Sequence, residues 1–180
     1  KLQCIKDTIK NINIVIGCSI GCSYCYARMN NNRFHTIDDF NKPVFFENKL
    51  KMLDNKRHTA YLLTGQSDLS GWNEEWKDKV FSKMKENENT QYIFLTKRPE
   101  NIKLKETPDN GWFGVTVTSS KEKTRIDYLR NNIKAKHYHI TFEPMFDDVG
   151  KLDLSNISWI VIGTETGNRK GKISSKREWV

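Results

Sequence analysis

The chain has 180 residues, with 30 Lys and Arg against 22 Asp and Glu, which gives a formal net charge of +8 at pH 7. Its 37% apolar and 29% charged residues are typical of a folded soluble domain and exclude global disorder. The longest apolar runs, such as Trp159–Ile162, are far shorter than the ~20 residues that cross a bilayer, so we expect no membrane span and a single domain over residues 1–180.

The first predicted strand, Ile12–Ile16, leads directly into a cysteine-rich loop. Cys18, Cys22 and Cys25 follow the spacing C-x3-C-x2-C, and Cys4 lies alone upstream. Three close thiolates can hold an iron–sulfur cubane and leave its fourth iron without a protein ligand. A zinc site completed by Cys4 or a His, and a cluster closed by Cys4, are the alternatives. Clustered cysteines without an apolar leader indicate a reducing, cytoplasmic compartment.

Five more short runs, rich in β-branched and aromatic residues, predict strands further along the chain. Nearly continuous apolarity suits strands that are covered on both faces, as in a parallel sheet. These runs are Ala60–Thr64, Tyr92–Thr96, Trp112–Val117, Tyr138–Phe142 and Trp159–Ile162.

Helical patterns separate several of these runs. Asn73 is a suitable N-cap for an amphipathic helix over Glu74–Glu86, and Pro99 can occupy the first turn of a shorter helix. Ser120 precedes a third helical segment, whose apolar stripe contains Ile126, Leu129 and Ile133. Six β-then-α units predict an α/β fold with parallel strands: a partial (β/α)6 TIM-like barrel or an open doubly wound sheet.

Polar residues follow the predicted strands at their carboxyl ends, where such folds bind ligands. The first strand leads into the cysteine loop, and the last leads into a glycine-containing loop. The polar candidates are Thr64, Gly65, Gln66, Ser67 and Asp68, then Thr96, Lys97 and Arg98, then Thr116 and Thr118, then Glu143, and finally Gly163, Thr164 and Glu165.

Together these motifs resemble the radical S-adenosylmethionine (SAM) superfamily, whose hallmark is a C-x3-C-x2-C loop after the first strand of a partial barrel. The resemblance is closer to a small branch found in phages and mobile elements, which includes the mobile-pair proteins. The segments that carry it are Asn13–Ala27, Leu95–Pro99, Gly114–Val117, Phe142–Pro144 and Ile162–Gly167.

The resemblance implies a 4Fe-4S cluster on Cys18, Cys22 and Cys25, with S-adenosyl-L-methionine chelating the fourth iron. It implies reductive cleavage of that cofactor, a low-potential electron donor, and hydrogen abstraction from an unidentified substrate. The implied cofactor contacts are Tyr24 beside the adenine; Gly65, Gln66, Ser67 and Asp68 near the methionine amino group; Lys97 near a carboxylate; Thr116 and Thr118 near the ribose and methionine; and Glu143, Gly163 and Glu165.

The segment from Arg169 to Arg177 contains five basic residues and no acidic one. Three interpretations are open: residues 168–180 form a flexible basic tail, guard the substrate opening, or contact nucleic acid. The excess positive charge and the resemblance to mobile-element proteins favour a nucleic acid or nucleotide over a peptide as substrate, and a co-encoded partner protein is a further expectation. The alternative to an enzyme is a non-catalytic zinc or iron–sulfur module that binds nucleic acid or a partner.

Overall fold

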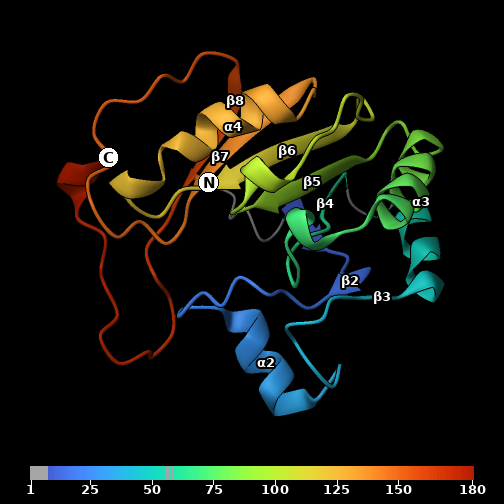
Figure 1. Cartoon of the computed structure of the whole chain (residues 1–180), viewed down its shortest axis with the longest axis horizontal. Helices are drawn as coiled ribbons and strands as arrows, with labels where there is room; N and C mark the ends of the chain where they lie inside the picture. Colours follow the sequence, from blue (N-terminus) through green and yellow to red (C-terminus); the bar gives the residue numbers. More distant parts are fainter. Residues whose placement is uncertain (1–7, 56, 58) are drawn as a thin grey trace.

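A computed structural model describes residues 8–55, 57 and 59–180, so Cys4 lies outside the described residues. Six strands form one sheet in the order β1-β4-β5-β6-β7-β8, and all neighbouring pairs are parallel. The sheet curls into a half-barrel (Figure 1), which confirms the predicted partial TIM-like barrel. The strands are β1 (Ile9–Asn11), β4 (Ala60–Leu62), β5 (Gln91–Thr96), β6 (Gly111–Thr116), β7 (His137–Phe142) and β8 (Ile157–Ile162).

The first strand lies earlier in the chain than predicted. The sheet contains β1, whereas the run Ile12–Ile16 leaves the sheet and contributes β2 (Val15–Ile16), which pairs antiparallel with β3 (Val44–Phe45). The apolar residues of this run are buried all the same. The prediction was therefore wrong in placing the sheet strand at Ile12–Ile16, because continuous apolarity reports burial and does not identify the pairing partner.

The helices agree with the sequence patterns more closely. Helix α3 spans Glu74–Lys85, and the Asn73 side chain accepts a hydrogen bond from the Trp76 backbone N–H at 2.9 Å, which confirms the predicted N-cap. Pro99 begins a short 3-10 helix, as expected. The other helices are α2 (Tyr26–Phe34), α4 (Thr124–Asn132) and 3-10 segments at Glu47–Asp54, Leu69–Gly71, Pro99–Asn101, Ser120–Glu122 and Arg177–Trp179.

Helix α4 begins later than Ser120 predicted. Ser120 lies in a 3-10 turn before the helix, and its backbone N–H and hydroxyl both bond to the Asp147 carboxylate, at 2.7 and 3.2 Å. Asp147 comes from the loop after β7, which is distant in sequence. No local pattern could therefore show that Ser120 is hydrogen-bonded to Asp147 and does not cap the helix. Only the crossovers before β5 and before β7 carry regular α-helices on the sheet among the described residues, so the expected β-then-α repeat is incomplete.

The main core lies between the sheet and helices α3 and α4, which cover its outer face (Figure 1). Phe94 and Phe113 stack in parallel with ring centroids 4.9 Å apart, and Phe81 from α3 packs edge-on against both. Burying each such ring stabilises the fold by about 1.5–3 kcal/mol. Helix α2 instead packs through Ala27 against a smaller core beside the cysteine loop. None of the helices in the described part of the chain combines the length and apolarity needed to span a membrane.

Candidate functional site at the carboxyl ends of the strands

The cysteine loop is joined to the loop after β4 at the carboxyl end of the sheet. The Gly17 N–H donates to the Gln66 carbonyl at 2.9 Å, and the Cys18 N–H donates to the Phe40 carbonyl at 2.6 Å. Gly17 has φ +115°, and a Cβ there would lie 2.9 Å from the Pro43 Cα, so only glycine fits where the chain turns into the loop. The loop thus starts from a fixed point at the edge of the predicted site.

The three cysteines lie on this loop with half-buried, unpaired thiols. Cys25 is the N-cap of α2, and its Sγ accepts a hydrogen bond from the Arg28 backbone N–H at 3.4 Å. Burial raises the pKa of the Cys18 thiol, and the nearby Cys22 and Cys25 sulfurs act in the same direction. A charge acts on a neighbouring thiol in this way only at short range, so the Cys22 and Cys25 sulfurs lie near Cys18.

The described residues contain no group of three His, Cys, Asp or Glu side chains placed to hold a metal ion. A cubane cluster needs a different arrangement of ligands from a single metal ion, because each thiolate binds a different iron atom.

Arg28 joins the two ends of the cysteine loop. Its guanidinium donates to the Cys18 carbonyl at 2.8 Å and to the Asn41 side chain at 3.0 Å, and it lies over the Phe40 ring, 5.0 Å from the centroid. The sequence analysis did not identify this residue. Its only signal is its position three residues after Cys25, on the helix that the last cysteine caps.

Tyr24, on the cysteine loop, contacts residues that follow several strands. Its ring meets Phe146 edge-on with centroids 5.3 Å apart, and the Lys97 ammonium lies 5.8 Å from its centroid. Burial raises the pKa of the Tyr24 phenol, and Cys22 and Glu122 act in the same direction. Tyr24 therefore connects the cysteine loop to the segments that follow β5, β6 and β7.

The loop after β4 contains the predicted Gly65–Asp68 motif. Both carboxylate oxygens of Asp68 are engaged: Oδ1 accepts from the backbone and hydroxyl of Ser70 and from the Thr96 hydroxyl, and Oδ2 accepts from the Lys97 N–H at 2.8 Å. Ser67 accepts from the Trp72 indole at 3.0 Å. Asp68 therefore joins the ends of β4 and β5, and a role in cofactor binding stays a prediction.

Three more of the predicted cofactor contacts lie at the ends of β5 and β6. Thr116 is the last residue of β6, with a buried side chain and a carbonyl that accepts from Arg125 at 2.7 Å. The N–H and hydroxyl of Thr118 both donate to Glu122, at 2.7 and 2.8 Å. Among the described residues Lys97 forms no ion pair, so its ammonium is free for an anionic ligand.

Glu143 lies directly after β7 and is exposed. Among the described residues its carboxylate has no hydrogen-bond or ion-pair partner. Burial raises the pKa of Tyr26, and the Cys25 sulfur and the Glu143 charge act in the same direction. The Tyr26 hydroxyl donates to the Gly65 carbonyl at 2.6 Å. A Cβ at Gly163, after β8, would lie 2.9 Å from the Glu143 Cγ, so glycine there leaves room for the glutamate. These contacts bring the ends of β4, β7 and β8 together beside the cysteine loop.

Glu165 is buried with its carboxylate already engaged. The Arg169 guanidinium donates to both oxygens, and the Ile173 N–H donates to Oε2 at 3.4 Å. These hydrogen bonds hold the pKa of Glu165 below its ordinary value. Glu165 therefore fixes the segment that follows it, and its predicted contact to the cofactor stays a prediction.

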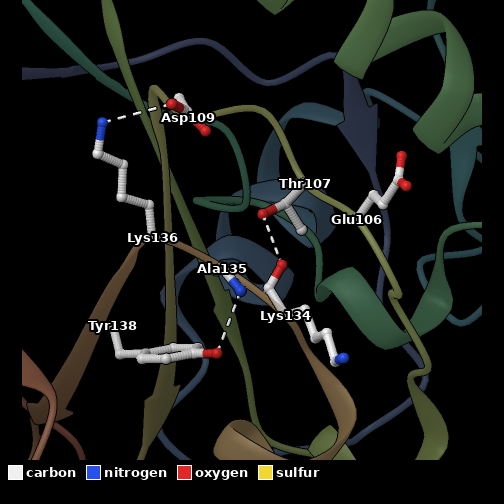
Figure 2. Close-up of a pocket in the computed structure, with 7 residues that line it drawn as sticks. All are labelled: Glu106, Thr107, Asp109, Lys134, Ala135, Lys136 and Tyr138. Atoms are coloured by element: carbon white, nitrogen blue, oxygen red, sulfur yellow. Dashed lines mark hydrogen bonds and ion pairs between the residues drawn. The ribbon is translucent and has the colours of Figure 1, made fainter.

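The opposite end of the sheet carries a shallow surface pocket of about 530 Å³ (Figure 2). Its residues precede or begin β6 and β7, and they include the Lys136–Asp109 ion pair at 3.3 Å. Parallel half-barrels bind ligands at the carboxyl ends of their strands. This pocket lies at the amino ends, so it is not the site of the predicted chemistry.

The fold and site define a parallel half-barrel protein with a three-cysteine loop at its ligand-binding end. A family model described as "Protein of unknown function (DUF5131)" matches residues 3–180, and the chain belongs to that family. Comparisons with curated proteins and with solved structures found no significant match.

Proposed function

We propose that this protein is a radical SAM enzyme that holds a 4Fe-4S cluster on Cys18, Cys22 and Cys25. The observation that carries the proposal is the position of the cysteine loop at the carboxyl end of a parallel half-barrel, next to the loops after β4, β5 and β7. In open parallel folds this is where ligands bind.

The donor set suits an iron–sulfur cluster. Three thiols lie near one another on one loop, and the Cys25 sulfur accepts a hydrogen bond from the Arg28 backbone N–H. Hydrogen bonds to cluster sulfurs and limited solvent exposure are the means by which proteins tune such clusters. Three protein ligands would leave one iron open, and clustered cysteines that form no disulfide with one another suit a cytoplasmic protein.

Cys18, Cys22 and Cys25 would hold the cluster, which when reduced and loaded with SAM would supply reductive cleavage of the cofactor for hydrogen abstraction from the substrate. The chain itself binds and orients the cofactor. Lys97 can donate to the cofactor carboxylate, and the oxygens of Gln66 or Glu143 can accept from its amino group. Tyr24 offers an aromatic face for the adenine. An external low-potential donor supplies the electron.

The test is anaerobic reconstitution with iron and sulfide, followed by addition of SAM and dithionite. We expect 5′-deoxyadenosine from the wild-type protein. Cys22→Ala should abolish it, because a cluster ligand is lost, whereas the matched control Cys4→Ala should retain it. A protein that binds one zinc ion and forms no 5′-deoxyadenosine would instead be a non-catalytic module, and product formation that persists in Cys22→Ala would refute the cluster assignment.

Lys97 provides a second test that separates cofactor binding from chemistry. Removing its ammonium by Lys97→Gln should raise the KM for SAM about tenfold or more, because a charge-assisted hydrogen bond contributes roughly 1.5–3 kcal/mol. Lys121→Gln, an exposed lysine after β6, is the matched control. An unchanged KM in Lys97→Gln would remove Lys97 from the cofactor site.

A further inference from the structure

The segment Arg169–Arg177, here called the basic segment, is fixed to the protein at several points. Arg169 pairs with Glu165, whose side chain is only 3% exposed. The Ser175 hydroxyl donates to the Met145 carbonyl at 2.8 Å, and the Ser175 N–H donates to the Thr164 hydroxyl at 3.0 Å. These bonds attach the segment to the loops that follow β7 and β8.

Four cations of the basic segment remain exposed after Arg169 has been neutralised: Lys170, Lys172, Lys176 and Arg177. Lys172 donates to a backbone carbonyl, which carries no net charge, and Lys176 lies 3.7 Å from the exposed Glu178. Lys170 and Arg177 form no ion pair within the described residues. The segment therefore presents excess positive charge that the chain itself does not compensate.

The basic segment lies at the same end of the sheet as the cysteine loop. Met145, which accepts from Ser175, is followed by Phe146, and the Phe146 ring contacts Tyr24 of the cysteine loop. Figure 1 shows the chain after β8 leaving the sheet and descending toward the level of that loop. The Lys97 ammonium also lies near Tyr24, 5.8 Å from its ring centroid, so a further cation occurs at this end of the sheet.

We propose that the basic segment binds the phosphate backbone of a nucleic acid. Fixed cations that lack carboxylate partners are what phosphate contacts require, and such contacts position a polymer without reading its sequence. A flexible chain of phosphates can reach the half-buried Lys97 as well as the exposed cations of the basic segment, whereas a planar lipid surface meets only the outermost ones. The inference rests on charge and folding alone, so it stands or fails separately from the radical chemistry.

The test measures binding of a fluorescein-labelled, 20-nucleotide single-stranded DNA of mixed sequence by fluorescence anisotropy, between 50 and 200 mM salt. SAM and reductant are omitted, so the outcome is independent of catalysis. The test variant is Lys170→Glu with Arg177→Glu. The control is Lys134→Glu with Lys136→Glu, which changes the net charge equally at the opposite end of the sheet (Figure 2).

We expect the test variant to weaken binding at least tenfold and to reduce the slope of log Kd against log salt by about 1.4, which is 0.7 for each of two lost phosphate contacts. The control should change Kd less than about threefold. Neutralisation by Lys170→Gln with Arg177→Gln should give a smaller loss in the same direction, and circular dichroism should show that all variants are folded.

Three results would overturn the proposal. Equal weakening by test and control variants would mean that only net charge matters. Failure of the wild-type protein to bind the DNA at 50 mM salt would mean that the surface does not bind nucleic acid. Binding to phosphatidylserine vesicles, but not to DNA, would assign the segment to a lipid surface.

Discussion

His139 makes the stability of this protein depend on pH. The side chain is 1% exposed, its Nε2 lies 3.0 Å from the Phe94 carbonyl, and its Nδ1 has no partner among the described residues. Burial lowers the pKa of His139 from 6.5 to about 4. The folded protein therefore keeps the imidazole neutral at pH values where the unfolded chain would protonate it.

The sign and size of the effect follow from this shift. Above pH 6.5 His139 is neutral in both the folded and the unfolded chain, so it does not lower the stability. As the pH falls toward 4, only the unfolded chain takes up the proton, and the free energy of unfolding falls. The loss is about 2 kcal/mol at pH 5 and about 3 kcal/mol at pH 4, from 1.36 kcal/mol for each unit.

Urea denaturation between pH 7.5 and 4 measures this loss. His139→Gln removes the titrating group, so the difference between wild type and variant cancels the contributions of the other groups. We expect that difference to change by about 2–3 kcal/mol over this range, with the wild type losing more stability. A difference that stays constant with pH would refute the assignment of a buried, neutral imidazole.

Three further substitutions test contacts at the site. Asp68→Asn should lower the free energy of unfolding by about 1–3 kcal/mol, because an amide cannot accept from all of its present donors; exposed Asp78→Asn is the urea-denaturation control, and equal midpoints would contradict this role. Glu165→Gln should speed trypsin cleavage within the basic segment, since Arg169 loses its charged partner; an unchanged cleavage rate would argue against the anchor. Arg28→Gln should lower the iron retained after reconstitution, whereas exposed Arg33→Gln should not; equal iron content would show that Arg28 is not needed to shape the loop.

The sequence predicted the half-barrel because most of its strands and helices are marked by local patterns. Five apolar runs correspond to the sheet strands β4 to β8, and Asn73 marks the start of α3 as expected. Both signals are local. A strand that is buried on both faces is marked by a continuous apolar run, and an N-cap lies next to the helix that it caps, so one sequence suffices to predict them.

What the sequence could not supply were the partners of its polar residues. Glu165 and Asp68 look alike as carboxylates after strands, but the first is paired with Arg169 and the second joins two strand ends. Glu143, by contrast, keeps a free carboxylate among the described residues. Such differences depend on contacts between loops distant in sequence, which also explains why Arg28 was missed and why Ile12–Ile16 was placed in the wrong sheet.

The most direct test of the central claim is electron paramagnetic resonance of the dithionite-reduced, reconstituted protein before and after addition of SAM carrying a ¹⁷O-labelled carboxylate. If three cysteines leave one iron open, the cluster signal should shift when SAM binds and broaden with the ¹⁷O label relative to unlabelled SAM. A cluster signal that SAM leaves unchanged, or a reconstituted protein that contains no cluster, would contradict the account.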